Sequence, residues 1–219
     1  MKLRIEFHCH TRYSLDCLTS VEQLIAACKA KSIDRVAITD HNTISGALAA
    51  HKLDPERVII GEEVKTTAGE LLAFFVKDEV PPYLDPLEAI RLLKEQGAFI
   101  SVSHPFDQLR SPWKLEQLKE ILPFIDAIET FNSRCMWSGF NRQAQAFARE
   151  HELAGTSGSD AHSLPELGAA TMTLEEFADA EGLRSAIRSA IPRNRLSGFW
   201  VHFASRKAVQ QKRLSERGT

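Results

Sequence analysis

The sequence lacks the features that mark a membrane or secreted protein. No apolar stretch approaches the roughly 20 residues that a membrane-spanning helix needs. Met1–Arg4 leads directly into a strand-like segment containing Glu6, which is unlike a secretory signal peptide. With 27 basic and 29 acidic side chains, the formal net charge of -2 indicates neither a nucleic acid nor a membrane as partner. We therefore expect a cytoplasmic protein that does not bind membranes.

Several redox and catalytic motifs are also missing. The four cysteines include no CxxC pair, so we expect free thiols rather than a disulfide framework. The chain has no P-loop and no GxGxxG segment that opens a helix. Ser103 and Ser159 lack a nucleophile-elbow motif, so a Ser-His-Asp triad is not supported.

What the sequence does contain is a repeated pattern of strand, loop and helix. A chain of 219 residues with 43% apolar side chains can build one α/β domain with a sizeable core. Strands are predicted at residues 3–7, 35–39, 58–60, 70–76, 98–102, 126–130, 153–156 and 169–173. Thr19-Ser20-Val21-Glu22 fits a capping box that opens a helix, and Asp85-Pro86 fits an N-cap followed by proline. The alternation predicts mostly parallel strands joined by crossover helices.

Histidines and carboxylates lie directly after these predicted strands. In His8-Cys9-His10, residues i and i+2 point to the same side, so both imidazoles can face one point. The residues in such positions are His8, His10, Asp16, Asp40, His41, Glu63, His104, Asp160 and His162. The ends of parallel strands share one rim in a closed barrel, whereas an open doubly wound sheet would bring together only those beside a switch point. Because many different strands contribute, we expect a closed barrel with a metal site at its rim.

This ligand set exceeds what a single tetrahedral ion needs. It predicts two or three divalent ions, with zinc, manganese and iron all compatible with mixed imidazole and carboxylate ligands. A carboxylate such as Glu63 would bridge them. Such a centre lowers the pKa of a bound water, and the resulting metal-bridging hydroxide can attack a phosphate ester. An arginine would then hold the phosphoryl oxygens that gain charge.

Five segments resemble, in order and spacing, the successive motifs of the PHP (polymerase and histidinol phosphatase) family. They are His8-Cys9-His10-Thr11, Thr39-Asp40-His41, Gly61-Glu62-Glu63, Ser103-His104-Pro105 and Gly158-Ser159-Asp160-Ala161-His162. The resemblance covers about residues 3–203. It implies a distorted (β/α)7 TIM-like barrel with a trinuclear metal site at the carboxyl ends of its strands. The ligands it implies are His8, His10, Asp16, His41, Glu63 as the bridging carboxylate, His104, Asp160 and His162.

One position departs from the family pattern. Many members carry a histidine on the strand after the Gly-x-Glu motif, whereas this strand begins Gly69-Glu70-Leu71. Glu70 either supplies an oxygen ligand instead or is an edge-strand glutamate that faces water. In the second case the third metal would be weak or absent. The chain also lacks the helical insertion of nucleotide-hydrolysing relatives, so their nucleotide specificity does not carry over.

Further residues invite roles around this centre. Arg12 and Arg134 follow predicted strands and could each reach a phosphate, while Asp160 or His162 could protonate the leaving group. These four are the candidate catalytic residues.

Three other side chains have open roles. Asp40 is expected to support His41 rather than to bind metal strongly. Asn132 either binds substrate or braces a ligand. His202 lies in the apolar segment 199–203 and is either a buried structural histidine or an acid on a late strand near the rim.

The resulting prediction is a metal-dependent phosphoesterase that acts on a small phosphorylated metabolite or nucleotide. The alternatives are a non-catalytic, metal-stabilised PHP-like binding module, and a C–N hydrolase or nuclease that uses the same centre. Long nucleic acid is the less expected substrate because the sequence shows no broad basic, aromatic-lined face. We assign residues 1–205 to the barrel domain and the basic, polar residues 206–219 to a frayed helix or tail. The sequence leaves the oligomeric state open.

Overall fold

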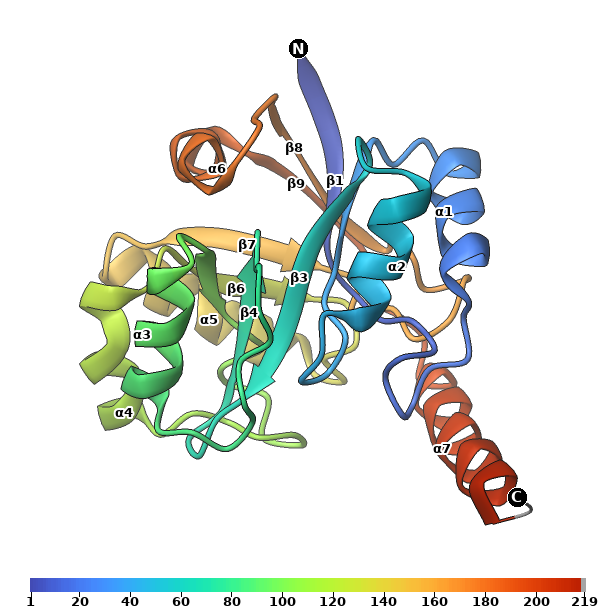
Figure 1. Ribbon diagram of the computed structural model, residues 1–219. Helices are drawn as coiled ribbons and strands as arrows, with labels where there is room; N and C mark the ends of the chain where they lie inside the picture. The colour runs from blue at the N-terminus through green and yellow to red at the C-terminus, as the bar shows by residue number, and fades with distance from the viewer. Residues whose placement is uncertain (218–219) are drawn as a thin grey trace.

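The computed structural model describes residues 1–217 and shows strands and helices alternating around a nearly closed barrel (Figure 1). The strands are β1 (Lys2–Cys9), β2 (Arg35–Ile38), β3 (Val58–Lys65), β4 (Glu70–Phe74), β5 (Phe99–Val102), β6 (Ala127–Asn132), β7 (Ala154–Gly158), β8 (Ala170–Glu175) and β9 (Ile191–Asn194). The helices are α1 (Val21–Ala30), α2 (Ser45–Leu53), α3 (Pro86–Glu95), α4 (Leu115–Ile121), α5 (Ser138–Glu150), α6 (Ala180–Ala186) and α7 (Val201–Arg217), with short 3-10 turns η1 (Leu122–Phe124) and η2 (Ile187–Ser189). The predicted α/β class is confirmed.

The sheet has the order β7-β6-β5-β4-β3-β2-β1-β8-β9. Strands β1, β2 and β3 are parallel, and β5, β6 and β7 run in the same direction because β4 is antiparallel to both β3 and β5. The hairpin between β3 and β4 pairs Lys65, the last residue of β3, with Glu70, the first residue of β4. The rim formed by the carboxyl ends of the parallel strands therefore also receives the start of β4.

The barrel closes where β7 approaches β1. Cys9 and Ala161 form a parallel bridge, and the backbone N–H of His10 donates to the carbonyl of Ala161 at 2.9 Å. A Cβ added to Gly158 would lie 2.2 Å from the Cβ of His8, so this close approach requires glycine. Strand β8 pairs antiparallel with the first half of β1, and β9 extends that edge.

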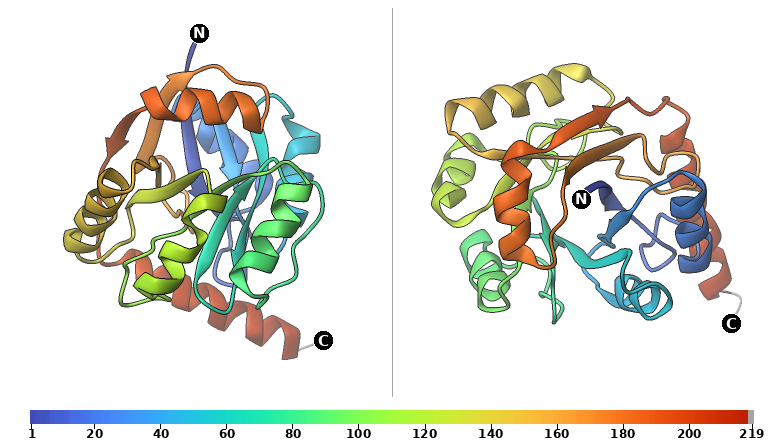
Figure 2. Two further views of the ribbon diagram at one scale, coloured as in Figure 1. Left: turned by 90° about the vertical axis from the view of Figure 1, so that its left-hand side faces the viewer. Right: turned by 90° about the horizontal axis from the view of Figure 1, so that it is seen from above.

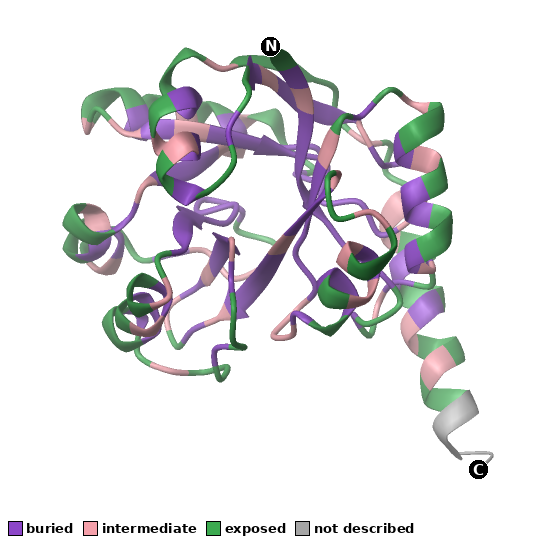
Figure 3. Cartoon of the chain, turned by 45° about the horizontal axis from the view of Figure 1, so that its top comes forward, coloured by how far each residue is buried: buried purple, intermediate pink, exposed green. Residues whose placement is uncertain are grey.

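Aromatic side chains from β1, β4 and β5 pack together inside the barrel, at the end opposite the rim. The ring centroids of Phe7 and Phe74 are 5.3 Å apart, and those of Phe74 and Phe99 are 5.8 Å apart. Helix α6 covers this end, while α7 lies at the opposite end, beside the rim (Figure 2). Buried residues concentrate on the barrel strands, and exposed residues lie on the outer faces of the helices and on loops (Figure 3). The chemistry-bearing rim is thus separated from the apolar core.

Two predicted helix starts have different outcomes. Asp85 caps α3 and is followed by proline in the first turn, as predicted. The predicted capping box at Thr19 and Glu22 is wrong by one residue, because Ser20 and Gln23 form the reciprocal hydrogen bonds at the start of α1. Thr19 is buried one residue earlier.

The segment that contains His202 is helical, whereas its sequence also allowed a late strand. Residues 199–203 form the turn before α7 and its first residues, so His202 is not on a strand. The expected domain boundary at 205/206 falls inside α7, which is held by the buried residues Ser205 and Ala208. Residues 218–219 of the predicted tail lie outside the described residues. Neither α7 nor any other helix within residues 1–217 is long and apolar enough to cross a membrane.

Candidate metal centre

The structure brings every predicted metal ligand to one rim of the barrel. The predicted ligands, with the strands that carry or precede them, are His8 and His10 (β1), Asp16 (the loop after β1), His41 (β2), Glu63 (β3), Glu70 (β4), His104 (β5), and Asp160 and His162 (β7). We call these nine residues the ligand cluster. They meet because parallel strands end at the same rim and because the antiparallel β4 starts there.

Glu63 occupies the middle of the ligand cluster. Its Oε2 lies 3.3 Å from His8 Nε2, 3.5 Å from His10 Nε2 and 3.0 Å from His41 Nδ1. Its Oε1 lies 3.2 Å from His104 Nε2. One carboxylate therefore faces imidazoles on both sides, which is the geometry expected of a bridging ligand.

Two aspartates complete the cluster. Asp160 Oδ1 lies 3.6 Å from His8 Nε2 and 3.2 Å from His10 Nε2. Asp16 Oδ2 lies 2.9 Å from His162 Nε2, although Asp16 belongs to a loop and not to a strand. Asp160 has a φ of 53°, in the left-handed region, so the backbone is strained at the residue that carries this carboxylate.

Several of these atoms are buried yet lack a hydrogen-bond partner within the described chain. They include His8 Nε2, His10 Nε2, His162 Nε2 and Glu63 Oε2. Each of these atoms lies close to an imidazole nitrogen or carboxylate oxygen of the cluster, but no such pair has the angles of a hydrogen bond. A buried polar atom without a partner costs about 1–3 kcal/mol. A divalent cation would provide the missing partner for all of them, so the donor set fits bound metal.

Three subsets of the cluster are compact enough to hold one ion each, with ligand atoms within 4.8 Å of one another. The subsets are His10, His41 and His162; His8, His10 and Glu63; and Glu63, Glu70 and His104. His10 and Glu63 each belong to two subsets and would be shared. Glu70 Oε2 lies 3.3 Å from His104 Nε2, which favours a ligand role over a glutamate that faces water.

A layer of buried carboxylates orients the ligands from behind. Glu129 Oε1 lies 2.9 Å from His8 Nδ1, and Glu129 Oε2 accepts hydrogen bonds from the backbone of His104 at 2.9 Å and from Asn132 Nδ2 at 3.0 Å. Asn132 Nδ2 also lies 3.1 Å from Asp160 Oδ2, so Asn132 braces two carboxylates. Contacts of this kind fix the orientation of ligating imidazoles.

Asp40 has a similar supporting position. It accepts hydrogen bonds from the backbone and hydroxyl of Thr11 at 2.7 and 2.6 Å and from Ser14 Oγ at 2.6 Å. Ser14 Oγ in turn accepts from the backbone N–H of His41 at 3.1 Å. Asp40 thus ties the loop after β1 to β2, which agrees with a supporting role.

The electrostatics of the cluster favour the metal-binding forms of His10 and Asp160 but the protonated form of His8. Burial, followed by two neighbouring imidazoles, lowers the pKa of His10 to about 4, so His10 is neutral near pH 7. Burial raises the pKa of Asp160, but His8 and Arg110 outweigh it and hold this pKa well below its usual value. Burial also lowers the pKa of His8, yet the carboxylates of Asp160 and Glu63 raise it well above its ordinary value. Metal binding at His8 would therefore displace a proton.

Arg110 is a site residue that the sequence analysis missed. Its guanidinium pairs with Asp160, lies 3.0 Å from Asp107 Oδ2 and donates to Asn132 Oδ1 at 3.1 Å. Its side chain is 27% exposed, so it also faces the cavity beside the cluster. The available signal was its position in the loop after β5, a few residues beyond His104.

The two predicted arginines occupy different environments. Arg134 is buried, with Nη1 at 2.5 Å from His162 Nδ1, Nε at 3.2 Å from Glu166 Oε1, and Nη2 donating to Ser205 Oγ at 2.7 Å. Arg12 has an exposed side chain. In the described part of the chain, it does not line either cavity at the rim. The structure thus brings Arg134, and not Arg12, to the ligand cluster.

Glu129 is the second missed residue. It interrupts the apolar run that begins Ala127-Ile128 in β6 and is 1% exposed. A buried charge of this kind requires a partner. A glutamate within an apolar strand could therefore have been identified as part of the site.

Comparisons with known proteins agree with this picture. The sequence profile of the PHP domain matches residues 6–110, and a profile described as PHP-associated matches residues 139–190. The uncharacterized protein MJ0417 of Methanocaldococcus jannaschii is 35% identical over 179 residues, which cover 80% of this chain and 72% of that protein.

Two solved structures share the fold. A protein from Bifidobacterium adolescentis, described as a metal-dependent phosphoesterase, has a TM-score of 0.63 and 18% identity, over 83% of this chain and 94% of that chain. The lesion-specific endonuclease PfuEndoQ from Pyrococcus furiosus has a TM-score of 0.66 and 18% identity, over 86% of this chain and 56% of that chain. At these identities the likeness concerns the fold.

The two profile matches together span the strand ends that carry the ligand cluster. The first includes His8 to His104, and the second includes Asp160 and His162. The same residues meet at a single rim of a nearly closed barrel, in the order in which the motifs occur along the chain. The chain therefore belongs to the PHP family.

Proposed function

We propose that the protein is a metal-dependent hydrolase of phosphate esters that acts on a small phosphorylated metabolite or nucleotide. The observation that carries this proposal is the convergence, within residues 1–217, of buried nitrogen and oxygen atoms that lack hydrogen-bond partners. Two or three zinc, manganese or iron ions at this position would supply Lewis acidity and hydroxide near neutral pH. Membership in the PHP family and the fold shared with a described metal-dependent phosphoesterase support it.

The chain's own residues divide the remaining work. Arg110 is partly exposed beside Asp160 and is the side chain best placed to bind phosphoryl oxygens. Arg134 borders the same cavity, but its contacts with His162 and Glu166 assign it mainly to holding His162 in place. Asp160 and His162 are the predicted proton donors to the leaving oxygen. Burial raises the pKa of Asp160, but His8 and Arg110 outweigh it and hold this pKa well below its usual value, while burial lowers the pKa of His162, so His162 is the better candidate of the two. The exposed side chain of Arg12 offers no support for a phosphate-binding role.

Three rival functions make different predictions. A metal-stabilised binding module would hold ions without turnover, whereas a nuclease would prefer diesters. The fold shared with PfuEndoQ makes the nuclease the stronger enzymatic alternative. A C–N hydrolase would hydrolyse neither phosphate monoesters nor phosphate diesters.

The deciding experiment combines metal analysis with two assays on protein that has never met a chelator. We expect two or three metal ions per chain by plasma mass spectrometry and hydrolysis of p-nitrophenyl phosphate. Faster hydrolysis of bis(p-nitrophenyl) phosphate would favour the nuclease. Bound metal without hydrolysis of either ester would favour the binding module or the C–N hydrolase. Less than one ion per chain, not restored by zinc, manganese or iron, would contradict the metal centre itself.

A further inference from the structure

A second cavity opens directly onto the ligand cluster. Its volume is about 510 Å³, and its lining shares Asp16, Arg110 and Arg134 with the cavity over the ligands. It is therefore continuous with the place where a phosphate would be attacked. Ligand cavities for small molecules measure roughly 300–1,000 Å³. This one is large enough for an organic group much bigger than phosphate.

One side of this cavity is built by α7 and the turn before it. We call Phe199, His202, Phe203 and Arg206 the α7 wall. Phe199 and Phe203 are 57% and 49% exposed, and their ring centroids are 5.6 Å apart. The ring of His202 lies 6.4 Å from that of Phe199. Aromatic rings exposed beside an active site offer flat surfaces on which another ring can stack.

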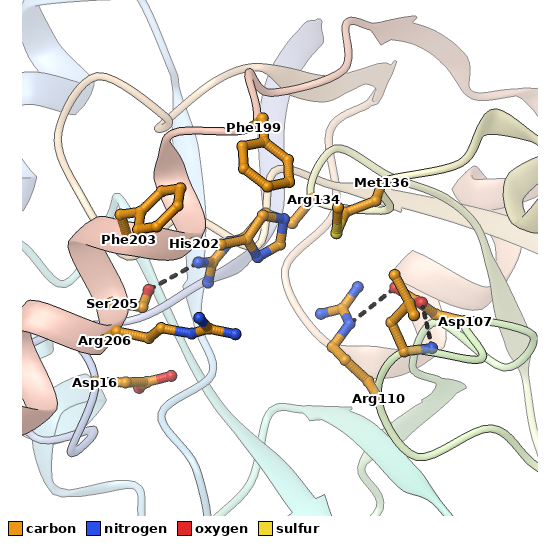
Figure 4. A pocket seen from close by; sticks show the side chains of 11 residues that line it. Asp16, Asp107, Arg110, Arg134, Met136, Phe199, His202, Phe203, Ser205 and Arg206 are labelled. Carbon is orange, nitrogen blue, oxygen red and sulfur yellow. Dashed lines mark hydrogen bonds and ion pairs between the residues drawn. The ribbon is translucent and has the colours of Figure 1, made fainter.

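The opposite side combines apolar and cationic groups. Leu109 and Met136 supply apolar surface, and Arg110 reaches toward Arg206 across the cavity (Figure 4). The lining contains three arginines and two aspartates. Arg110 pairs with Asp107 and Asp160, and Arg134 pairs with Glu166, which leaves Arg206 as the lining arginine best able to attract an anionic group. The cavity therefore favours a ligand that is negatively charged and also carries a flat apolar part.

The α7 wall is fastened to the metal centre. Arg134 donates to the carbonyl of Val201 at 3.3 Å and to Ser205 Oγ at 2.7 Å, while its Nη1 lies 2.5 Å from His162 Nδ1. Lys212 donates from further along α7 to the carbonyls of Arg12 and Ser14, in the loop that leads to Asp16. A ligand held against the α7 wall is thus placed relative to the reacting phosphate.

We infer that this cavity binds the organic part of the substrate, and that this part carries a flat aromatic ring in a phosphate ester of nucleoside monophosphate size. Because the planes of Phe199 and Phe203 meet at 67°, the ring would stack on the face of one phenyl ring and contact the other at its edge, while Arg110 and Arg206 bind the negative charge. The inference deepens the proposed function and rests on it for the position of the phosphate. Recognition of the aromatic ring would come from α7 of this chain.

A binding measurement tests the inference without relying on turnover. The probes are non-hydrolysable methylene phosphonate analogues of adenosine 5′-monophosphate and of ribose 5-phosphate, which differ only in the base. Titration calorimetry on the metal-loaded protein should show the adenosine analogue binding at least about tenfold more tightly, on the scale of ring stacking. The double variant Phe199→Ala/Phe203→Ala should abolish this preference.

Phe124→Ala is the matched control, because Phe124 is 42% exposed and lines a different groove, beside α3. It should keep the preference for the adenosine analogue. Equal binding of both analogues by the unmodified protein, or a preference that survives the double variant, would overturn the inference. Much tighter binding of a 5′-phosphorylated oligonucleotide than of the mononucleotide analogue would overturn it too, in favour of a nucleic-acid groove.

Hydrolysis of the two parent esters separates this inference from the proposed function. Release of phosphate from both, with adenosine 5′-monophosphate preferred, supports both proposals. A retained binding preference without any hydrolysis would overturn the phosphoesterase assignment while supporting the aromatic cavity. Hydrolysis without a binding preference would support the phosphoesterase and overturn the cavity assignment.

Discussion

The ligand cluster and the α7 wall border one continuous cavity but are built in opposite ways. His8 and His10 are fully buried, and Glu129 holds His8 from behind. Phe199 and Phe203 are about half exposed and are positioned by the start of a terminal helix. The ligands depend on the whole barrel, whereas the wall depends on the few contacts that anchor α7.

This difference indicates a division of labour. A polynuclear centre needs ligands held within a narrow geometry, which buried second-layer hydrogen bonds provide. A surface that recognises the organic part of a substrate needs area and shape, and it can change without disturbing the ligands. Changes in the cluster should therefore affect metal content and rate, while changes in the α7 wall or in its Lys212 anchor should affect substrate binding alone.

The largest effect should follow Glu63→Gln. This change removes the carboxylate that faces imidazoles on both sides. We expect loss of at least one metal ion and a fall in kcat of about a thousandfold or more, beyond the roughly 10- to 100-fold typical of outer-layer losses. Metal analysis and p-nitrophenyl phosphate kinetics measure both quantities.

Glu62→Gln is the control for this variant. Glu62 is also buried, accepts from the backbone of Val80 at 3.1 Å, and lies outside the compact ligand subsets found in residues 1–217. Burial raises its pKa to about 7, so glutamine resembles its protonated form. Equal metal loss in both variants would show that β3 as a whole, and not the Glu63 carboxylate, is responsible.

Arg110→Gln should have the next largest effect. The variant keeps the ligands but removes the guanidinium expected to bind phosphoryl oxygens beside Asp160. We expect kcat/KM to fall about a hundredfold, as for loss of one transition-state hydrogen-bond donor, with unchanged metal content. Arg142→Gln, on the exposed face of α5, is the control and should be silent. A metal content that fell with activity would assign Arg110 to organising Asp160 instead.

Glu129→Gln should weaken metal binding moderately. Its Oε1 lies 2.9 Å from His8 Nδ1 and orients the imidazole without belonging to a ligand subset. We expect metal affinity to drop by about 10- to 100-fold in competition titrations with a chelating indicator. The exposed Glu150→Gln should leave affinity unchanged. Normal affinity in Glu129→Gln would show that His8 does not need this partner.

The smallest effect should come from Lys212→Met, which acts on the anchor of the α7 wall. The ammonium group donates to the carbonyls of Arg12 and Ser14 at 2.6 and 2.5 Å. Losing these contacts should raise KM about fivefold, the scale of one hydrogen bond, and leave kcat and metal content unchanged. Lys207→Met, on an exposed part of the same helix, should change neither. A fall in kcat would show that the Lys212 contacts also support the ligand cluster, and would contradict the separation of the two regions.

Much of the barrel and the family could be predicted because the relevant signals are local. His8 and His10 follow a two-residue period, and Asp160 and His162 repeat it at the end of another strand. Once alternating strands and helices imply a shared rim, residues at separate strand ends become neighbours. The same reasoning placed His41 and His104 at the rim, where the structure has them.

The missed residues depend on contacts that no local pattern contains. Arg110 meets Asp160, 50 residues away, and Glu129 meets His8, 121 residues away. The segment at 199–203 was ambiguous because apolar residues in a short run fit a strand or a helix equally well. Only its packing beside Arg134 shows that it begins a helix that borders the site.

The amino-acid sequence by itself determined the alternation of strands and helices, the family, and the supply of histidines and carboxylates at strand ends, because each follows from short-range order along the chain. The tertiary structure decided that β4 turns back, which puts Glu70 on the rim, and that Gly158 lets β7 close against His8. It also decided which buried charges face one another and which helix forms one side of the cavity. These outcomes depend on the relative placement of distant segments, and that placement is set by packing of the whole barrel.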